Sequence, residues 1–88
     1  MKNIKSHTFN GRVYKIAMTG PIDGMTDTYS LYERIMVISS EPYTKSELET
    51  AVHESLHASN WAASEEVVTR VGRDVARFLW RLGYRRQK

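Results

Sequence analysis

The residue types with the clearest chemistry lie between positions 53 and 57, where the chain reads His-Glu-Ser-Leu-His. On a helix, His53 and His57 lie about one turn apart on the same face, so both imidazoles can bind one metal ion. Glu54, beside the first histidine, is placed to take a proton from an attacking water molecule rather than to bind the metal. The pattern H-E-x-x-H therefore predicts a metal site with Glu54 as its catalytic base.

A catalytic metal site of this kind needs a third protein ligand. The chain has no cysteine, and its only other histidine, His7, lies far upstream, so a carboxylate is the expected donor. Glu65 and Glu66 open the next predicted helix, which a short connector brings back to the motif. At about 100° per residue, Glu65 borders the seam between the helices and Glu66 points toward solvent. We therefore expect His53, His57 and Glu65 to bind Zn²⁺, with Glu66 as the alternative third ligand.

Two helices must position these side chains. The first is predicted over residues 45–59, because Thr44 and Glu47 fit a capping box. In this motif, each side chain accepts a hydrogen bond from the backbone N–H of the other residue. The second is predicted over residues 65–82, and Gly83 is typical of a helix end. Its expected buried face consists of large apolar side chains at helical spacing: Val68, Val71, Val75, Phe78, Leu79 and Leu82. The short connector predicts that the two helices pack antiparallel.

Three strands are expected to complete the fold. Strands over residues 4–9 and 12–18 flank Asn10-Gly11, which is the strongest short signal for a tight hairpin turn. A third strand is expected over residues 32–39, where four consecutive apolar residues indicate a buried segment. The predicted class is therefore α+β, an antiparallel three-stranded sheet packed on a two-helix hairpin, in one domain covering residues 1–88.

Composition places the chain among ordinary globular proteins, since 41% of its residues are apolar and 26% are charged. A chain this short often depends on a metal or on oligomerisation for stability. No segment approaches the roughly 20 apolar residues of a membrane span, and the N-terminus lacks the apolar run of a signal peptide. We therefore expect a cytoplasmic protein with no membrane partner.

The motif and its surroundings resemble known metallopeptidases. H-E-x-x-H followed by a glutamate on the next helix resembles the gluzincin arrangement of zinc metallopeptidases. The run from the third strand through TAVHESLHA to SEEVVTRVGRDVARFLWRLGYR, roughly residues 31–86, is similar to short H-E-x-x-H proteins encoded in bacteriophage genomes. This resemblance implies bound zinc, a minimal zincin-like, metallopeptidase-like scaffold and a phage or prophage origin, but it implies no known substrate. From the site residues, the leading expectation is zinc-dependent hydrolysis of a peptide or protein substrate. The gap from His57 to Glu65 is shorter than in large gluzincins, and Tyr43, Tyr84 or an arginine could stabilise an oxyanion.

A basic face on the second helix suggests a different function. Its cationic residues recur every three or four positions and continue past the helix end: Arg70, Arg73, Arg77, Arg81, Arg85, Arg86 and Lys88. A nucleic-acid-binding protein would show this pattern, but so would a solvated helix face, and no recognition-helix signature is present. The alternative to a peptidase is therefore a non-catalytic, zinc-stabilised binding module that contacts a host protein or, less favoured, nucleic acid through its arginines.

Overall fold

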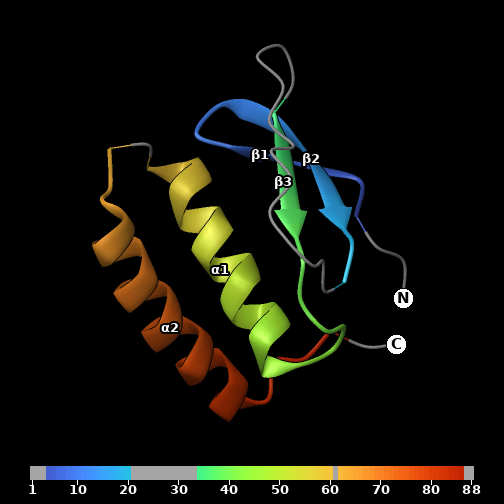
Figure 1. Cartoon of the computed structure of the whole chain (residues 1–88), viewed down its shortest axis with the longest axis vertical. Helices are drawn as coiled ribbons and strands as arrows, with labels where there is room; N and C mark the ends of the chain where they lie inside the picture. The colour runs from blue at the N-terminus through green and yellow to red at the C-terminus, as the bar shows by residue number, and fades with distance from the viewer. Residues whose placement is uncertain (1–3, 21–33, 61, 87–88) are drawn as a thin grey trace.

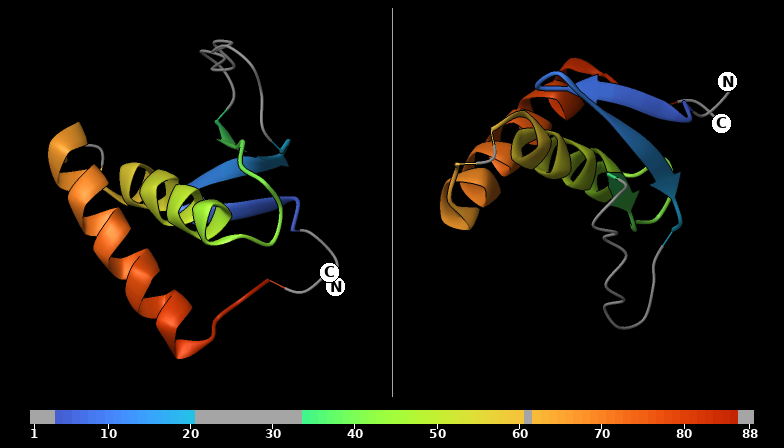
Figure 2. Two further views of the ribbon diagram at one scale, coloured as in Figure 1. Left: turned by 60° about the horizontal axis from the view of Figure 1, so that its bottom comes forward. Right: turned by 90° about the horizontal axis from the view of Figure 1, so that it is seen from above.

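The computed structural model describes residues 4–20, 34–60 and 62–86. Its elements, in chain order, are β1 (Ser6–Phe9), β2 (Arg12–Met18), β3 (Ile35–Ile38), α1 (Lys45–Ser59) and α2 (Glu65–Leu82). Helix α1 packs on the sheet, and α2 packs on the side of α1 that faces away from the sheet (Figures 1 and 2). The predicted α+β class is confirmed, with three strands on a two-helix hairpin.

The first two strands form the predicted hairpin. They pair antiparallel, with Ser6 opposite Lys15 and Phe9 opposite Arg12. Asn10 and Gly11 between them have φ values of 51° and 73°. Positive φ at both central residues is what a type I′ turn requires, and this turn matches the twist of the strands it joins. The Asn-Gly signal is therefore confirmed.

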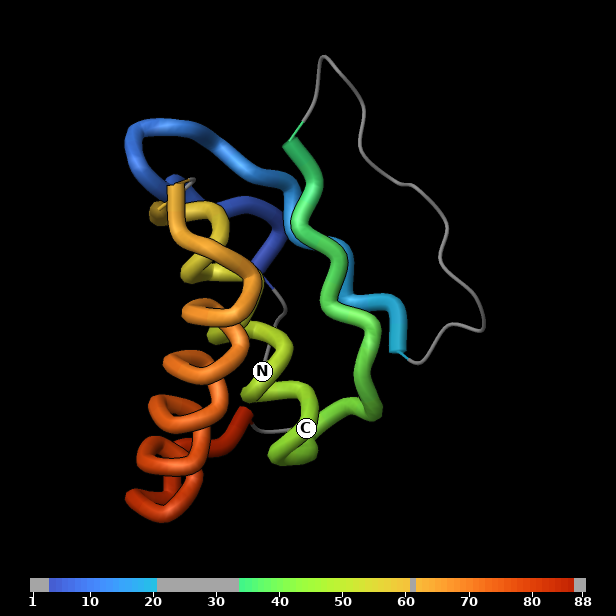
Figure 3. Tube along the Cα trace, turned by 60° about the vertical axis from the view of Figure 1, so that its left-hand side comes forward, coloured from blue at the N-terminus to red at the C-terminus, as the bar shows by residue number. Residues whose placement is uncertain are grey.

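The third strand runs parallel to β2, so the sheet is mixed, with β3 at its edge. Lys15 lies opposite Ile35 and Met18 lies opposite Ile38, and Figure 3 shows the two strands side by side. The prediction of an antiparallel sheet is wrong for this pair. The segment from Met18 to Ile35 exceeds the dozen or so residues that a parallel crossover requires, so its length permits this direction. Residues 32 and 33 of the predicted strand lie outside the described residues.

The two helices begin and end at the predicted residues. The Thr44 side chain accepts a hydrogen bond from the Glu47 backbone N–H at 3.1 Å, and Ser64 caps α2 in the same way. Gly83, with φ of 96°, closes α2 in the left-handed conformation that favours glycine. Of the expected capping box, only the threonine half is formed as predicted, because the Glu47 carboxylate binds Arg86 instead. Neither described helix has the length and apolar character needed to cross a membrane.

The seam between the helices is made of small residues. Val68 and Ala76 are 1% and 0% exposed, and Gly72 between them is also buried. A Cβ built on Gly72 would lie 3.4 Å from the Cα of His53, so the two backbones approach closely there. The predicted buried face is therefore wrong in part: Val75, Phe78 and Leu82 are exposed, because α2 turns its small side chains, rather than its large ones, toward α1.

The hydrophobic core lies between α1 and the sheet. Met36, Ile38 and Ala58 form its buried centre, and the inward-facing side chains of β2 pack against it. Beside it, the hydroxyls of Ser40 and Thr50 lie 2.6 Å apart, which ties the chain after β3 to α1. This packing places α1, whose second half carries the H-E-x-x-H motif, against the sheet.

Candidate metal centre

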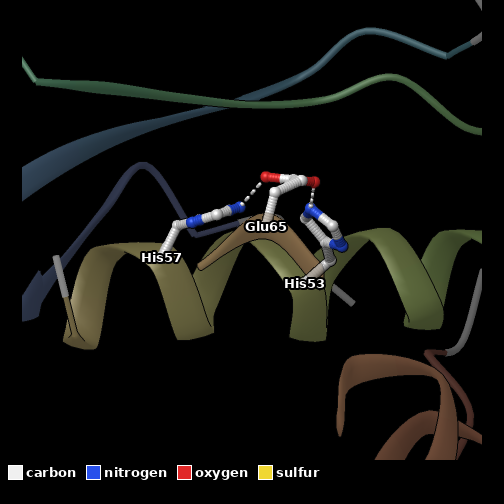
Figure 4. A group of neighbouring side chains, drawn as sticks. All are labelled: His53, His57 and Glu65. Carbon is white, nitrogen blue, oxygen red and sulfur yellow. Dashed lines mark ion pairs between the residues drawn. The ribbon is translucent and has the colours of Figure 1, made fainter. Parts of the chain in front are cut away.

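The two motif histidines and Glu65 converge on one point, as Figure 4 shows. Nε2 of His53 lies 2.9 Å from Oε1 of Glu65, and Nε2 of His57 lies 2.7 Å from Oε2. The histidines project from successive turns of α1 with ring centroids 4.9 Å apart. The structure therefore brings together the three residues that the sequence analysis predicted as metal ligands.

Glu65 reaches this position because it continues the helix seam by one turn. Glu65, Val68, Gly72 and Ala76 follow one another along α2 at intervals of three, four and four residues. By rotation of about 100° per residue, Glu65 points within roughly 20° of Gly72, whereas Glu66 points roughly 120° away. Glu65 was expected only at the border of the seam, because the seam was expected to consist of large apolar residues. With the seam that is observed, the choice of Glu65 over Glu66 follows more strongly.

The electrostatics of the group favour an ionised carboxylate. Desolvation acts to raise the pKa of Glu65, but the hydrogen bond with His57 and the charges of both imidazoles outweigh it and hold the pKa below 4.5. The Glu65 side chain is 69% exposed, while the two imidazoles are partly buried. A metal or a ligand can therefore reach the group from solvent on the carboxylate side.

The three side chains could hold a metal ion. Each offers one donor atom, and the donors all lie within 4.8 Å of one another. Four-coordinate zinc with bonds of about 2.0–2.1 Å separates its ligand atoms by about 3.3 Å, so small side-chain movements would convert these contacts into a coordination shell. Two imidazole nitrogens and a carboxylate oxygen are a donor set that zinc accepts. The residues present therefore fit the expected ion.

Glu54 is next to His53 in the sequence and lines a cleft that adjoins the three candidate ligands. With His57 and Ala58 it lines a cleft of about 200 Å³ between α1 and the sheet, whose other walls are Tyr14, Ile35 and Met36. Burial raises the pKa of the Glu54 carboxyl above 4.5, against the opposing charges of His53 and His57. A carboxylate in a partly apolar cleft next to a metal site is suited to proton transfer. The predicted distinction between Glu54 and the ligands is consistent with this geometry.

The proposed oxyanion groups do not lie at this site. Tyr43 and Tyr84 line a separate, mainly apolar cavity of about 320 Å³ near the start of α1. At least about 12 Å of helix separates that end from His53. Tyr14, which lines the Glu54 cleft, was missed: its inward position on β2 was predictable, but its place beside Glu54 depends on how the sheet packs on α1. His7 stacks on Phe9 at 4.8 Å, outside the ligand group.

The arginines of the predicted basic face divide into two groups. Arg70, Arg73, Arg77 and Arg81 are exposed on α2. Arg85 lies 3.6 Å over the Trp80 ring, and Arg86 forms an ion pair with the buried Glu47, so Arg86 does not belong to the basic face. Among the described residues, no ion pair joins Asp74 to the arginines beside it. Lys88 lies outside the described residues.

Comparison of the chain with protein-family models, with curated proteins and with solved structures found no match. The group His53, His57 and Glu65 could hold a metal ion, and Glu54 lines a cleft next to it.

Proposed function

We propose that this chain is a zinc-dependent hydrolase of peptide bonds. His53, His57 and Glu65 would hold the ion, and Glu54 would act as general base. The observation that carries the proposal is the convergence of two imidazole nitrogens on one carboxylate at 2.9 and 2.7 Å. The adjoining cleft, which Glu54 lines together with His57, supplies a place for the reacting bond.

The chain's own residues suffice for the proton transfers. When bound, zinc supplies a Lewis acid that polarises the scissile carbonyl and makes water more acidic. Glu54 takes a proton from the attacking water as the water oxygen bonds to the carbonyl carbon. The C–N bond then breaks, and Glu54 returns the proton to the leaving nitrogen. The immediate products are a carboxylic acid and an amine, and transfer of the remaining proton from the acid to the amine gives a carboxylate and an ammonium ion, so atoms and charge balance.

The substrate would lie against β3, one of the two edge strands of the described sheet. An extended peptide can pair with the backbone of an exposed edge strand, which fixes its position without requiring a particular sequence. Ile35 and Met36 of this strand also form a wall of the Glu54 cleft. A peptide paired there would present its backbone to the catalytic residues, while apolar side chains reduce the access of bulk water.

Glu54→Gln is the direct test of this reaction. The substitution keeps the shape of the side chain but removes the base, so we expect normal folding, unchanged zinc content and a loss of peptide hydrolysis of at least about 100-fold. Glu49→Gln, the same change on the same helix outside the cleft, is the matched control. Elemental analysis measures the metal, and mass spectrometry of a mixed peptide library measures cleavage. Full activity of Glu54→Gln would rule out the proposed base.

Tyr14 is the group best placed to stabilise the developing oxyanion, because it is the only phenol among the described residues that line the Glu54 cleft. Tyr14→Phe should lower kcat by about 10- to 100-fold with little change in KM, since the hydroxyl would act mainly in the transition state. The ring and its edge contact with Phe9 remain in this variant. An unchanged kcat would remove Tyr14 from the mechanism.

A non-catalytic binding module is the alternative, and the exposed row of arginines on α2 supports it. In that case wild type and Glu54→Gln would both bind zinc and neither would cleave peptides. Salt-sensitive binding to random DNA would then favour a nucleic-acid partner, and its absence at low ionic strength would favour a protein. Stoichiometric zinc binding by His53→Ala or His57→Ala would contradict both functions.

A further inference from the structure

The cavity of about 320 Å³ near the start of α1 is a second concave site in this molecule. Its aliphatic walls come from both strands of the parallel pair and from α1: Ile16, Met18, Ile38, Leu48 and Ala51. The volume is at the lower end of the range of about 300–1,000 Å³ that small-ligand sites occupy. The cavity therefore suits a ligand with one short chain or one ring.

The chain after α2 closes one wall of this cavity. Gly83 ends the helix in the left-handed conformation, and residues 84–86 return past the start of α1, where Arg86 pairs with the buried Glu47 (Figure 1). This ion pair places Tyr84 and Arg85 at the cavity. Glu47 is 6% exposed and Tyr84 is 63% exposed, so the cavity runs from a buried end at Glu47 to a mouth at Tyr84.

Aromatic rings lie beside the arginines of the cavity. The Tyr43 ring lies 4.3 Å from the guanidinium of Arg86, and the Trp80 ring lies 3.6 Å from that of Arg85. Tyr43 also has a φ of 65°, in the left-handed region that costs free energy for a residue with a Cβ. Residues held in such conformations cluster at functional sites, including ligand clamps. The backbone of Tyr43 is thus a second feature that indicates a binding site here.

The charges that line the cavity are not balanced. Glu47 is the only acid among the described lining residues, and Arg86 neutralises it. Arg85 donates a hydrogen bond to the Trp80 carbonyl at 3.0 Å, and it has no ion pair with a described residue. One uncompensated positive charge therefore lies at the mouth of an apolar cavity. A guanidinium can bind a carboxylate through two parallel N–H groups, so the complementary ligand is apolar and carries a carboxylate.

We propose that this cavity binds a small apolar carboxylic acid, with its hydrocarbon chain between α1 and the sheet and its carboxylate at Arg85. Burial of the chain drives binding, and each buried methylene tightens it by about fourfold. Arg85 selects the anionic head group. The site does not depend on the proposed hydrolase, because it shares no described lining residue with the Glu54 cleft or the metal ligands.

Three ligands with the same heptyl chain test the head group: octanoate, octanol and octylamine. Binding is followed by NMR titration of the full chain, with chelator present so that octanoate cannot bind through a metal ion. We expect saturable shifts at Leu48, Ala51 and the Trp80 indole N–H, with octanoate about three- to tenfold tighter than octanol and octylamine weakest. Absence of saturable shifts at these residues in millimolar octanoate, or equal affinity for octylamine and octanoate, would overturn the proposal.

Arg85→Gln tests the contact with the carboxylate. The side chain is exposed, so the fold should be retained. Octanoate should bind about three- to tenfold more weakly, whereas the affinity for octanol should stay within about twofold of wild type. Arg81→Gln, the same change at an exposed arginine of α2 that does not line the cavity, is the matched control. Equal losses of octanoate affinity in the two variants would overturn the role of Arg85.

Ala51→Leu tests the position of the hydrocarbon chain. The larger side chain projects into the cavity, so octanoate and octanol should both bind at least about tenfold more weakly. Ala62→Leu, at an exposed alanine between the helices, is the control, and circular dichroism measures the folding of both variants. Unchanged binding by folded Ala51→Leu would overturn the proposal. Should Ala51→Leu not fold, wild type decides: hexanoate should bind about tenfold more weakly than octanoate, and equal affinities would overturn the proposal.

Discussion

The ion pair between Glu47 and Arg86 joins residues far apart in the sequence. Glu47 is 6% exposed, and its two carboxylate oxygens accept hydrogen bonds from Nε and Nη2 of Arg86, both at 2.9 Å. The guanidinium also lies 4.3 Å over the Tyr43 ring. The hydrogen bond from Arg86 holds the pKa of Glu47 below 4.5, against the opposing effect of burial. This carboxylate therefore stabilises the fold only in its ionised form.

The pair predicts a specific pH dependence of stability. Because the folded pKa of Glu47 is lower than the unfolded value, its contribution is present above about pH 4.5 and is lost as the pH falls through the folded pKa. Glu47→Gln should lower the free energy of unfolding at neutral pH and flatten its decline in acid. Urea unfolding of wild type and variant from about pH 7 to about pH 3 measures the difference.

Arg86→Ala should have a similar effect at neutral pH, a loss of about 1–3 kcal/mol, since it leaves a buried carboxylate without its hydrogen-bond donors. Arg81→Ala, which removes an exposed arginine, should change stability by less than about 0.5 kcal/mol. If the free energy of unfolding falls equally steeply with decreasing pH in wild type and in Glu47→Gln, this pair does not control the acid stability of the protein.

Among the elements, the contact of α2 with α1 depends on Gly72. An alanine Cβ there would lie 3.4 to 3.6 Å from backbone and Cβ atoms of His53, an ordinary contact distance. Gly72→Ala should therefore fit and should stabilise the protein by up to about 1 kcal/mol, because alanine favours the helix more than glycine does. Gly72→Val adds two methyl groups for which the close approach of the helices leaves no room.

We expect Gly72→Val to separate α2 from α1, with a loss of about 1–3 kcal/mol and weaker zinc binding, because Glu65 would move away from His53. Thermal unfolding of both variants checks that Gly72→Ala raises stability and Gly72→Val lowers it, and zinc titration checks the weaker zinc binding of Gly72→Val. Destabilisation by Gly72→Ala would mean that the helices are closer than in this structure.

The limits of the sequence analysis are also clearest for the elements. Helix ends were predictable because Thr44, Ser64 and Gly83 act locally through their own caps. The buried face of α2 was not predictable, because apolar periodicity favours large side chains, whereas α2 packs against α1 through Gly72 and Ala76. The direction of β3 was not predictable either, since it depends on pairing between segments distant in the chain. The convergence of His53, His57 and Glu65 was predicted because it needed only the motif spacing and the return of α2 beside α1.

At the scale of the whole molecule, α2 differs from the other described elements in packing on one element alone. Helix α1 packs on both the sheet and α2, whereas α2 packs on α1 alone among the described elements. Its seam contains glycine and alanine, which bury little apolar area. The ligand group bridges this same interface, since two of its members lie on α1 and the third on α2. A bound ion would therefore fasten α2 to the rest of the fold.

This arrangement predicts that metal removal loosens α2 selectively. At free zinc about 100 times its Kd, binding stabilises the docked state by about 2.7 kcal/mol, which corresponds to roughly 100-fold rarer opening. Amide hydrogen exchange should therefore accelerate by up to about that factor in α2 when chelator is added, with much smaller changes in β1 and β2. His57→Ala, which lacks a ligand, should show no response to chelator. Equal acceleration in the sheet and in α2 would mean that α2 does not open separately and that zinc stabilises the fold as one cooperative unit.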